Sequence, residues 1–167
     1  MFSRRLFTTT TLALAGALVS GKMSADAADD TTKRFEIMKS EEEWKKILTP
    51  DQFYVLRKHG TERAGTSPLD KTYAEGTYKC AGCDLPVYTS DTKFDSGTGW
   101  PSFFKPIDNA TGTSVDKSFF TTRTEVHCSR CGGHLGHVFE DGPQPTGLRY
   151  CMNGVAMTFE PKKAGPA

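Results

Sequence analysis

The chain has 167 residues, of which 37% are hydrophobic and 25% are charged. This length fits one globular domain with a short tail at one end or both. Its 21 basic and 20 acidic residues give a net charge of +1, which excludes a surface that binds polyanions through bulk charge. We therefore expect no nucleic-acid partner.

Residues 1–27 are predicted to be a targeting segment. The first 25 residues contain no acidic residue, and they carry the pair Arg4-Arg5 and a short apolar run at 12–19. Because that run is far shorter than the roughly 20 residues that span a bilayer, no stable membrane association is expected. The arginine pair resembles a twin-arginine signal and predicts an exported, periplasmic protein, with a mitochondrial presequence as the alternative. The remaining chain divides into a linker, a folded domain and a tail, at 28–39, 40–161 and 162–167.

Two capping boxes predict two consecutive short helices at the start of the domain. In each box a hydroxyl residue stands three positions before a residue whose side chain can accept the backbone amide of the hydroxyl residue. The two pairs are Ser40 with Glu43 and Thr49 with Gln52. His59 precedes a glycine and is expected to cap the end of the second helix.

From residue 76 onward the pattern changes to short β-type runs separated by turn residues. The predicted strands are Thr77–Lys79, Pro86–Thr89, Ser118–Val126, Leu148–Met152 and Val155–Phe159. The sequence therefore predicts a mainly β domain, mostly antiparallel, with a helical preface.

Four of the five cysteines form two C-x-x-C pairs, Cys80 with Cys83 and Cys128 with Cys131. Such a pair lets two sulfurs face one ion, and two pairs complete a Cys₄ zinc site. Because four thiolates leave no open position, we expect one structural Zn²⁺ per chain. The alternatives are two disulfides or a redox-active pair of the thioredoxin kind.

The fifth cysteine, Cys151, is the candidate nucleophile. Arg149 and Asn153 stand two residues before and after it, so on a strand the three side chains would share a face. A nearby guanidinium stabilises a thiolate, and we expect it to lower the pKa of Cys151 below its free value. The alternative is a buried, inert cysteine.

The pair His134 and His137 follows the second C-x-x-C, where a metal-anchored turn would fix the direction of both rings. A histidine is the natural proton shuttle for a thiol reaction. The alternatives are zinc ligation and a purely structural role. Glu125, Trp100 and Phe139 are further candidate pocket residues, and Trp100 lies in a glycine-rich loop of the kind that often binds ligands.

Taken together, these motifs resemble the B-type methionine sulfoxide reductases. The resemblance covers about residues 40–161. It implies a fold of two antiparallel sheets, with the zinc remote from the active site. The matching segments are GTE at 60–62, C-x-x-C at 80–83, GWPSF at 99–103, HLGHVF at 134–139, DGP at 141–143 and PTGLRYCMN at 145–153.

The resemblance also assigns roles to the candidate residues. It implies that the Cys151 thiolate attacks the sulfoxide sulfur and is left as a sulfenic acid. It implies that His134 and His137 hold the polar end of the substrate and relay protons. Glu125 and Asn153 are expected to assist them.

The implied substrate is the R sulfoxide of methionine in oxidised proteins, which the enzyme would repair. Trp100 is expected to pack on the methyl group and so to select the handedness of the sulfoxide, with Phe139 as a second substrate-binding residue. Arg149 would stabilise the thiolate before attack.

One departure from the family concerns the loop before GWPSF, where many members carry a resolving cysteine and this chain has Thr98. We therefore expect an external thiol, from a thioredoxin-like protein or a small molecule, to reduce the sulfenic acid. The alternatives to an enzyme are a non-catalytic zinc module that binds a partner and a redox sensor.

Overall fold

The computed structural model describes residues 35–118 and 121–163. These residues belong to one compact unit. The predicted targeting segment, most of the linker and residues 164–167 lie outside the described residues. Within the described ranges, no helix is long and apolar enough to span a bilayer.

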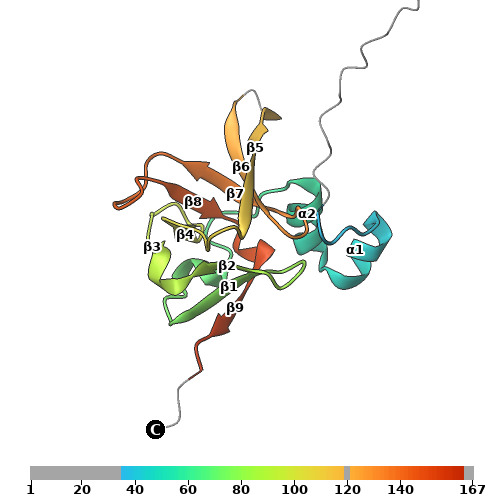
Figure 1. Cartoon of the computed structure of the whole chain (residues 1–167), viewed down its shortest axis with the longest axis horizontal. Coiled ribbons are helices and arrows are strands. Elements are labelled where there is room, and N and C mark those ends of the chain that lie inside the picture. Colours follow the sequence, from blue (N-terminus) through green and yellow to red (C-terminus); the bar gives the residue numbers. More distant parts are fainter. Residues whose placement is uncertain (1–34, 119–120, 164–167) are drawn as a thin grey trace, which may run out of the picture. The chain divides into compact units, whose positions relative to one another are not determined.

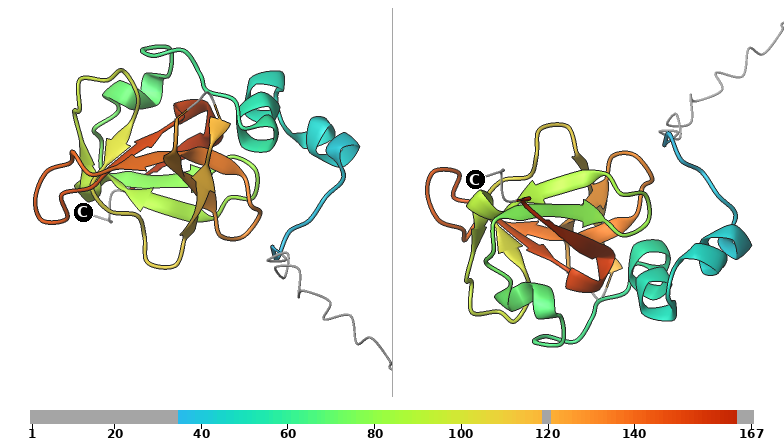
Figure 2. Two further views of the ribbon diagram at one scale, coloured as in Figure 1. Left: turned by 90° about the horizontal axis from the view of Figure 1, so that it is seen from above. Right: turned by 90° about the horizontal axis from the view of Figure 1, so that it is seen from below.

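The described chain opens with two short helices, α1 (Glu41–Ile47) and α2 (Pro50–Lys58). Both predicted capping boxes are present. The Ser40 hydroxyl accepts the Glu43 amide at 3.3 Å, and the Thr49 hydroxyl accepts the Gln52 amide at 3.2 Å. His59 is the C-cap of α2 in the left-handed conformation, with φ of 55°. Both views of Figure 2 place α2 closer to the sheets than α1, and α2 contacts β7.

The larger sheet has six antiparallel strands in the order β3-β4-β8-β7-β6-β5, with β7 and β8 near its middle (Figure 1). Its strands are β3 (Lys93–Phe94), β4 (Ser102–Phe103), β5 (Thr111–Asp116), β6 (Arg123–Cys128), β7 (His134–Phe139) and β8 (Arg149–Met152).

The smaller sheet has three antiparallel strands in the order β2-β1-β9. Its strands are β1 (Gly76–Cys80), β2 (Pro86–Thr89) and β9 (Met157–Pro161). Short 3₁₀ helices connect elements of both sheets, namely η1 (Pro68–Lys71), η2 (Ser90–Thr92) and η4 (Gly154–Ala156).

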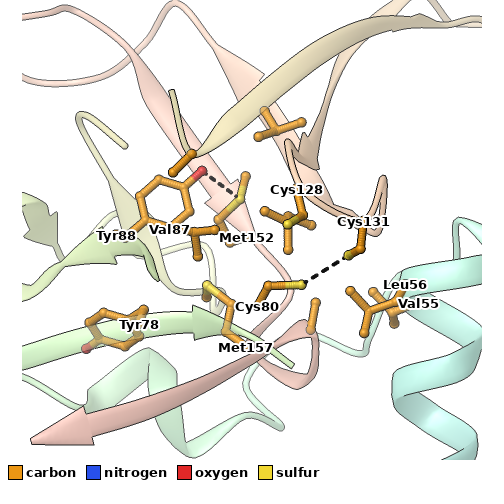
Figure 3. Packing of buried hydrophobic residues seen from close by; sticks show 14 of the residues in the cluster. Val55, Leu56, Tyr78, Cys80, Val87, Tyr88, Cys128, Cys131, Met152 and Met157 are labelled. Atoms are coloured by element: carbon orange, nitrogen blue, oxygen red, sulfur yellow. Dashed lines mark hydrogen bonds between the residues drawn. The ribbon is translucent and has the colours of Figure 1, made fainter. Parts of the chain in front are cut away.

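Aromatic side chains join the two sheets in the core. The ring of Phe103 on β4 stacks on Tyr88 of β2, with 4.3 Å between centroids, and meets Tyr78 of β1 edge-on at 4.9 Å. The Tyr88 hydroxyl also donates to the Met152 sulfur on β8 at 3.1 Å (Figure 3). These residues are completely buried, so the core fixes how β4 and β8 lie against the smaller sheet.

The predicted fold class, mainly β with two antiparallel sheets and a helical preface, is confirmed. Two predicted strands were misplaced. The run at 118–126 is a strand only from Arg123, and the run at 155–159 begins with η4, so the strand starts at Met157. The strands β3, β4, β5 and β7 were not predicted, and His134 and His137, which follow the second C-x-x-C, lie on β7.

Candidate active site

A row of polar side chains crosses the larger sheet in register. Ser114 pairs with Glu125, Glu125 with His137, His137 with Cys151, and Cys151 with Ser102. Because residues directly opposite each other in neighbouring strands project to the same face, these side chains share one face of the sheet. The strand pairing alone therefore brings a carboxylate, an imidazole and a thiol into one line.

Cys151 opens into a small cavity of about 120 Å³. Among the residues that the structure describes, its lining contains none of the four cysteines of the two C-x-x-C pairs. The lining brings together five of the predicted site residues, namely Cys151, His137, Asn153, Trp100 and Phe139. The full lining is Thr61, Trp100, Arg123, Gly136, His137, Phe139, Cys151 and Asn153. Aromatic walls around a few polar groups are typical of a small-ligand site.

The indole of Trp100 is fixed by its loop. Its Nε1 donates to the Glu62 carbonyl at 3.1 Å. The loop that carries it bends at Gly97 and Gly99, whose φ angles are 71° and 85°, a region that favours glycine. The Trp100 side chain is therefore held in place in the cavity wall before any ligand arrives.

Asn153 follows β8 directly and is buried. Its side-chain carbonyl accepts the Glu62 amide at 2.9 Å, and its side-chain amide donates to the Leu135 carbonyl at 3.1 Å. Both polar ends of the amide thus bind main chain, which fixes its orientation beside Cys151.

Arg149 forms a two-pronged ion pair with Asp141, with both nitrogen–oxygen distances at 2.8 Å, and its guanidinium lies 4.5 Å from the centroid of the Phe139 ring. Burial raises the pKa of the Cys151 thiol, while Thr98 and Arg149 act to lower it. Burial prevails, so the expectation of a lowered pKa was wrong for the ligand-free protein. The guanidinium does not outweigh desolvation because Asp141 already neutralises it.

His137 is held by Asp116, whose carboxylate lies 2.8 Å from its Nε2. Burial lowers the pKa of His137 more than Asp116 raises it, which favours the neutral ring. Arg123 also pairs with Asp116 at 2.8 Å and lines the cavity. Neither Asp116 nor Arg123 was predicted. They face each other across the hairpin of β5 and β6, a register that the sequence analysis missed.

His134 and Glu125 occupy a different position from the one predicted. Neither lines the cavity; the Glu125 carboxylate lies 2.7 Å from His134 Nδ1 and 2.8 Å from His59 Nδ1. Burial raises the pKa of Glu125, but hydrogen bonds from both histidines and from Ser114 outweigh it and hold the pKa well below its ordinary value. Nε2 of the buried His134 has no hydrogen-bond partner among residues 35–118 and 121–163, and its ring meets that of His137 edge-on at 5.2 Å.

The four remaining cysteines form a cluster at the end of β1, at the end of β6 and in the turns that follow, in which Cys83 is partly exposed and the other three are buried. The sulfurs of Cys80 and Cys131 lie 3.7 Å apart and those of Cys83 and Cys128 lie 3.5 Å apart (Figure 3 shows the first pair). All four lie within 4.8 Å of one another. A tetrahedron with zinc–sulfur bonds of about 2.3 Å has edges of about 3.8 Å, so the donors fit one ion. All four cysteines are free of disulfides, which argues against the two-disulfide alternative.

Comparisons with known proteins agree with this arrangement. The model of the SelR domain family matches residues 48–161. The peptide methionine sulfoxide reductase MsrB of Agrobacterium fabrum is 53% identical over 127 residues, which cover 75% of this chain and 94% of the relative. The protein of the same name from Methanosarcina barkeri is 54% identical over 130 residues, which cover 77% and 92%. The chain therefore belongs to the B-type methionine sulfoxide reductase family.

Proposed function

We propose that this chain reduces the R sulfoxide of methionine in proteins back to methionine, with Cys151 as the nucleophile. The observation that carries the proposal is the cavity whose lining brings Cys151 together with His137, Trp100 and Phe139. A cavity of about 120 Å³ suits the methylsulfinyl end of a side chain, since one water takes up about 30 Å³ of liquid.

The first half-reaction transfers one oxygen atom. The Cys151 sulfur attacks the sulfoxide sulfur and forms a transient sulfur–sulfur bond. The oxygen is then transferred to the Cys151 sulfur as both the sulfur–oxygen bond of the substrate and the sulfur–sulfur bond break, which leaves methionine and a Cys151 sulfenic acid. The sulfur of the substrate is reduced by two electrons and that of Cys151 is oxidised by two. The thiol proton ends on the sulfenic oxygen, so no net proton is consumed.

The residues around the cavity serve this transfer in different ways. His137, oriented by Asp116, lies opposite Cys151 in register, so its neutral ring can take up the thiol proton and pass it to the departing oxygen. Trp100 packs on the substrate methyl group and Phe139 forms the opposite wall, so together they select the R epimer. Arg149 stabilises the thiolate as it forms, because it acts to lower the pKa of Cys151.

His134, Glu125 and Asn153 complete the proposed catalytic set. Glu125 holds His134 through Nδ1, and the ring of His134 meets that of His137 edge-on. From there His134 supports the proton transfer through His137. Asn153 holds the main chain that borders the cavity.

Regeneration requires a thiol from outside the chain. The four other cysteines are gathered in one cluster, and Thr98 lies 3.9 Å from the Cys151 sulfur, in the loop where the family resemblance implies a resolving cysteine in many members. A first external thiol condenses with the sulfenic acid to give water and a mixed disulfide, and a second thiol releases Cys151. A thioredoxin-like protein supplies both thiols at once.

We propose that the four-cysteine cluster holds one structural zinc ion, through Cys80, Cys83, Cys128 and Cys131. The sulfur spacing supports this assignment. A four-thiolate site has no open position, so the ion would add folding energy and take no part in the reaction. Metal analysis should find one zinc per chain, lost together with the fold on chelation.

The deciding assay presents the R and S sulfoxides of a methionine derivative to the full chain with dithiothreitol. We expect consumption of the R epimer alone, and none by Cys151→Ser. Consumption of neither epimer would favour the redox-sensor or zinc-module alternatives. Equal turnover by the Cys151→Ser protein would remove Cys151 from the mechanism.

For localisation we propose export to the periplasm. The support is the arginine pair at 4–5 and the short apolar run at 12–19. The amino-terminal residue of the mature protein distinguishes this from mitochondrial import, because the export signal predicts cleavage close to residue 27.

A further inference from the structure

A chain of three hydroxyl groups links the Cys151 sulfur to a main-chain carbonyl. The Thr98 hydroxyl lies 3.9 Å from the Cys151 sulfur and 2.8 Å from the Ser96 hydroxyl. The Ser96 hydroxyl lies 2.7 Å from that of Ser102, which in turn lies 3.1 Å from the Trp100 carbonyl. Ser102 is completely buried, so the far end of the chain is shielded from water.

The number of hydroxyl protons determines in which direction the hydrogen bonds run along this row of hydroxyl groups. A hydroxyl has one proton to donate, and a carbonyl only accepts. Ser102 donates to the Trp100 carbonyl, so it must accept from Ser96. Ser96 must then accept from Thr98, whose single proton is used in that bond. Thr98 therefore has only a lone pair left for Cys151, and it accepts from the thiol.

This direction suits a protonated sulfur and not an anionic one. A thiolate needs a donor, and hydrogen bonds to charged groups are the strong ones. For Thr98 to donate to the sulfur, Ser96 must turn its proton toward Thr98, and Ser102 must turn its proton from the Trp100 carbonyl toward Ser96. Each change is a rotation about a C–O bond, and no covalent bond breaks.

We propose that these hydroxyls form a reversible hydrogen-bond chain that sets the reactivity of Cys151. It runs from the thiol to the Trp100 carbonyl at rest, and it reverses to donate to the sulfur when Cys151 becomes a thiolate or a sulfenate. Reversal leaves the Trp100 carbonyl without the Ser102 bond, so the resting direction favours the thiol. Thr98, Ser96 and Ser102 are thus positioning residues for the nucleophile. The proposal rests on the proposed function only in taking Cys151 as the reacting group.

Other titratable groups surround the sulfur and stay constant in the test. On its own strand, Arg149 faces Cys151 and pairs with Asp141. From β7, His137 lies opposite Cys151 in register. Arg123 of β6 lines the same cavity. Asp116 of β5 binds both Arg123 and His137.

Changing two of these hydroxyl residues should therefore shift the pKa of Cys151 in opposite directions. Thr98→Val removes the hydroxyl that is placed to donate to the thiolate, so we expect the pKa to rise by about half a unit or more. Ser96→Ala removes the acceptor that occupies the Thr98 proton. Thr98 is then free to donate to the sulfur without any reversal, and we expect the pKa to fall by a similar amount.

The measurement is the rate of iodoacetamide alkylation of the Cys151 peptide against pH, read by mass spectrometry on the zinc-loaded full chain. Thr98→Ser keeps the hydroxyl and should leave the pKa near that of the unchanged protein. Thr158→Val, at an exposed position on β9 of the other sheet, is the matched control and should have no effect. Thermal unfolding checks that each variant is folded.

Opposite shifts in Thr98→Val and Ser96→Ala support the proposal. A rise or no change in Ser96→Ala, or no change in Thr98→Val, overturns it. If Ser96→Ala does not fold, Ser102→Ala takes its place. Without the Ser102 hydroxyl, Ser96 is free to donate to Thr98, so the pKa of Cys151 should again fall. No sulfoxide is present, so these shifts stand or fall independently of whether the chain reduces methionine sulfoxide.

Discussion

The same residue type occupies two contrasting regions of this molecule. In one region four cysteines are gathered within 4.8 Å of one another, at the edge of the hydrophobic core. In the other region Cys151 faces a small cavity with Thr98, Arg149 and His137 around it. The four sulfurs have each other as neighbours, whereas Cys151 has a hydroxyl, a guanidinium and an imidazole.

The contrast shows that a cysteine takes its role from its surroundings. Mutual proximity makes the four thiols a ligand set, which commits their lone pairs to a metal and gives them a structural role. Cys151 is separated from them and reaches a cavity large enough for a substrate group, so its sulfur stays available for chemistry. Substitutions in the two regions test this difference in role, and the largest effect is expected at Cys151.

The largest effect is expected for Cys151→Ser. Removing the only nucleophile should lower the rate of R-sulfoxide reduction by at least about 10³-fold. Because serine is nearly the same size, the free energy of unfolding should change by less than about 1 kcal/mol. Turnover and urea unfolding measure the two quantities. A large loss of stability would show that Cys151 is structural after all.

The opposite outcome is expected for Cys83→Ser in the cluster. A structural zinc site contributes about 10–16 kcal/mol of apparent binding energy, which is also folding energy, and a domain is stable by only about 5–15 kcal/mol. The variant should lose zinc and unfold at 37 °C, as judged by metal analysis and circular dichroism. A folded, zinc-free and active Cys83→Ser protein would contradict the structural role of the cluster.

A smaller effect is expected at Glu125, which holds two histidines behind the cavity. Glu125→Gln removes a buried charge that accepts three hydrogen bonds, and we expect a loss of about 1–3 kcal/mol in unfolding free energy. Turnover should fall because His134 is no longer fixed, while zinc content stays at one per chain. Glu140→Gln, at an exposed position, is the control. Equal turnover in both variants would remove Glu125 from the site.

The smallest effect is a shift in pH dependence. Because burial raises the pKa of Cys151, its thiolate forms only at higher pH, and alkylation should reach its midpoint above the ordinary value of about 8.5. Arg149→Met removes a nearby cation and should move the midpoint still higher, by about half a unit. Arg63→Met, at an exposed position, should not move it. A midpoint that falls in Arg149→Met would contradict the assigned role.

Local signals in the sequence were sufficient to predict the two helices and the two C-x-x-C pairs. A capping box acts within four residues, so Ser40 and Thr49 mark the helix starts without reference to the rest of the fold. Likewise, C-x-x-C spacing indicates a ligand pair by itself. The strands β5 and β7 were missed for opposite reasons. The exposed β5 has little apolar character, and β7 is buried on both faces over residues 134–137, so neither shows a two-residue alternation.

Parts of the site depended on contacts between distant segments, which the sequence could not reveal. Asp116 and Arg123 join the site through the register of β5 and β6. The pKa of Cys151 was predicted in the wrong direction because the Asp141 partner of Arg149 and the burial of the sulfur are visible only in the fold. Residue identity indicated which groups take part, and the strand pairing decided which of them meet.

The central claim, that Cys151 is the only redox-active thiol, is tested most directly by trapping the oxidised enzyme. The zinc-loaded chain is treated with a methionine R-sulfoxide and no reductant, and sulfenic acids are captured with dimedone before mass spectrometry. We expect one adduct, on the peptide that carries Cys151, with the zinc retained. An adduct on any of the other four cysteines, or a disulfide between Cys151 and one of them, would contradict the account.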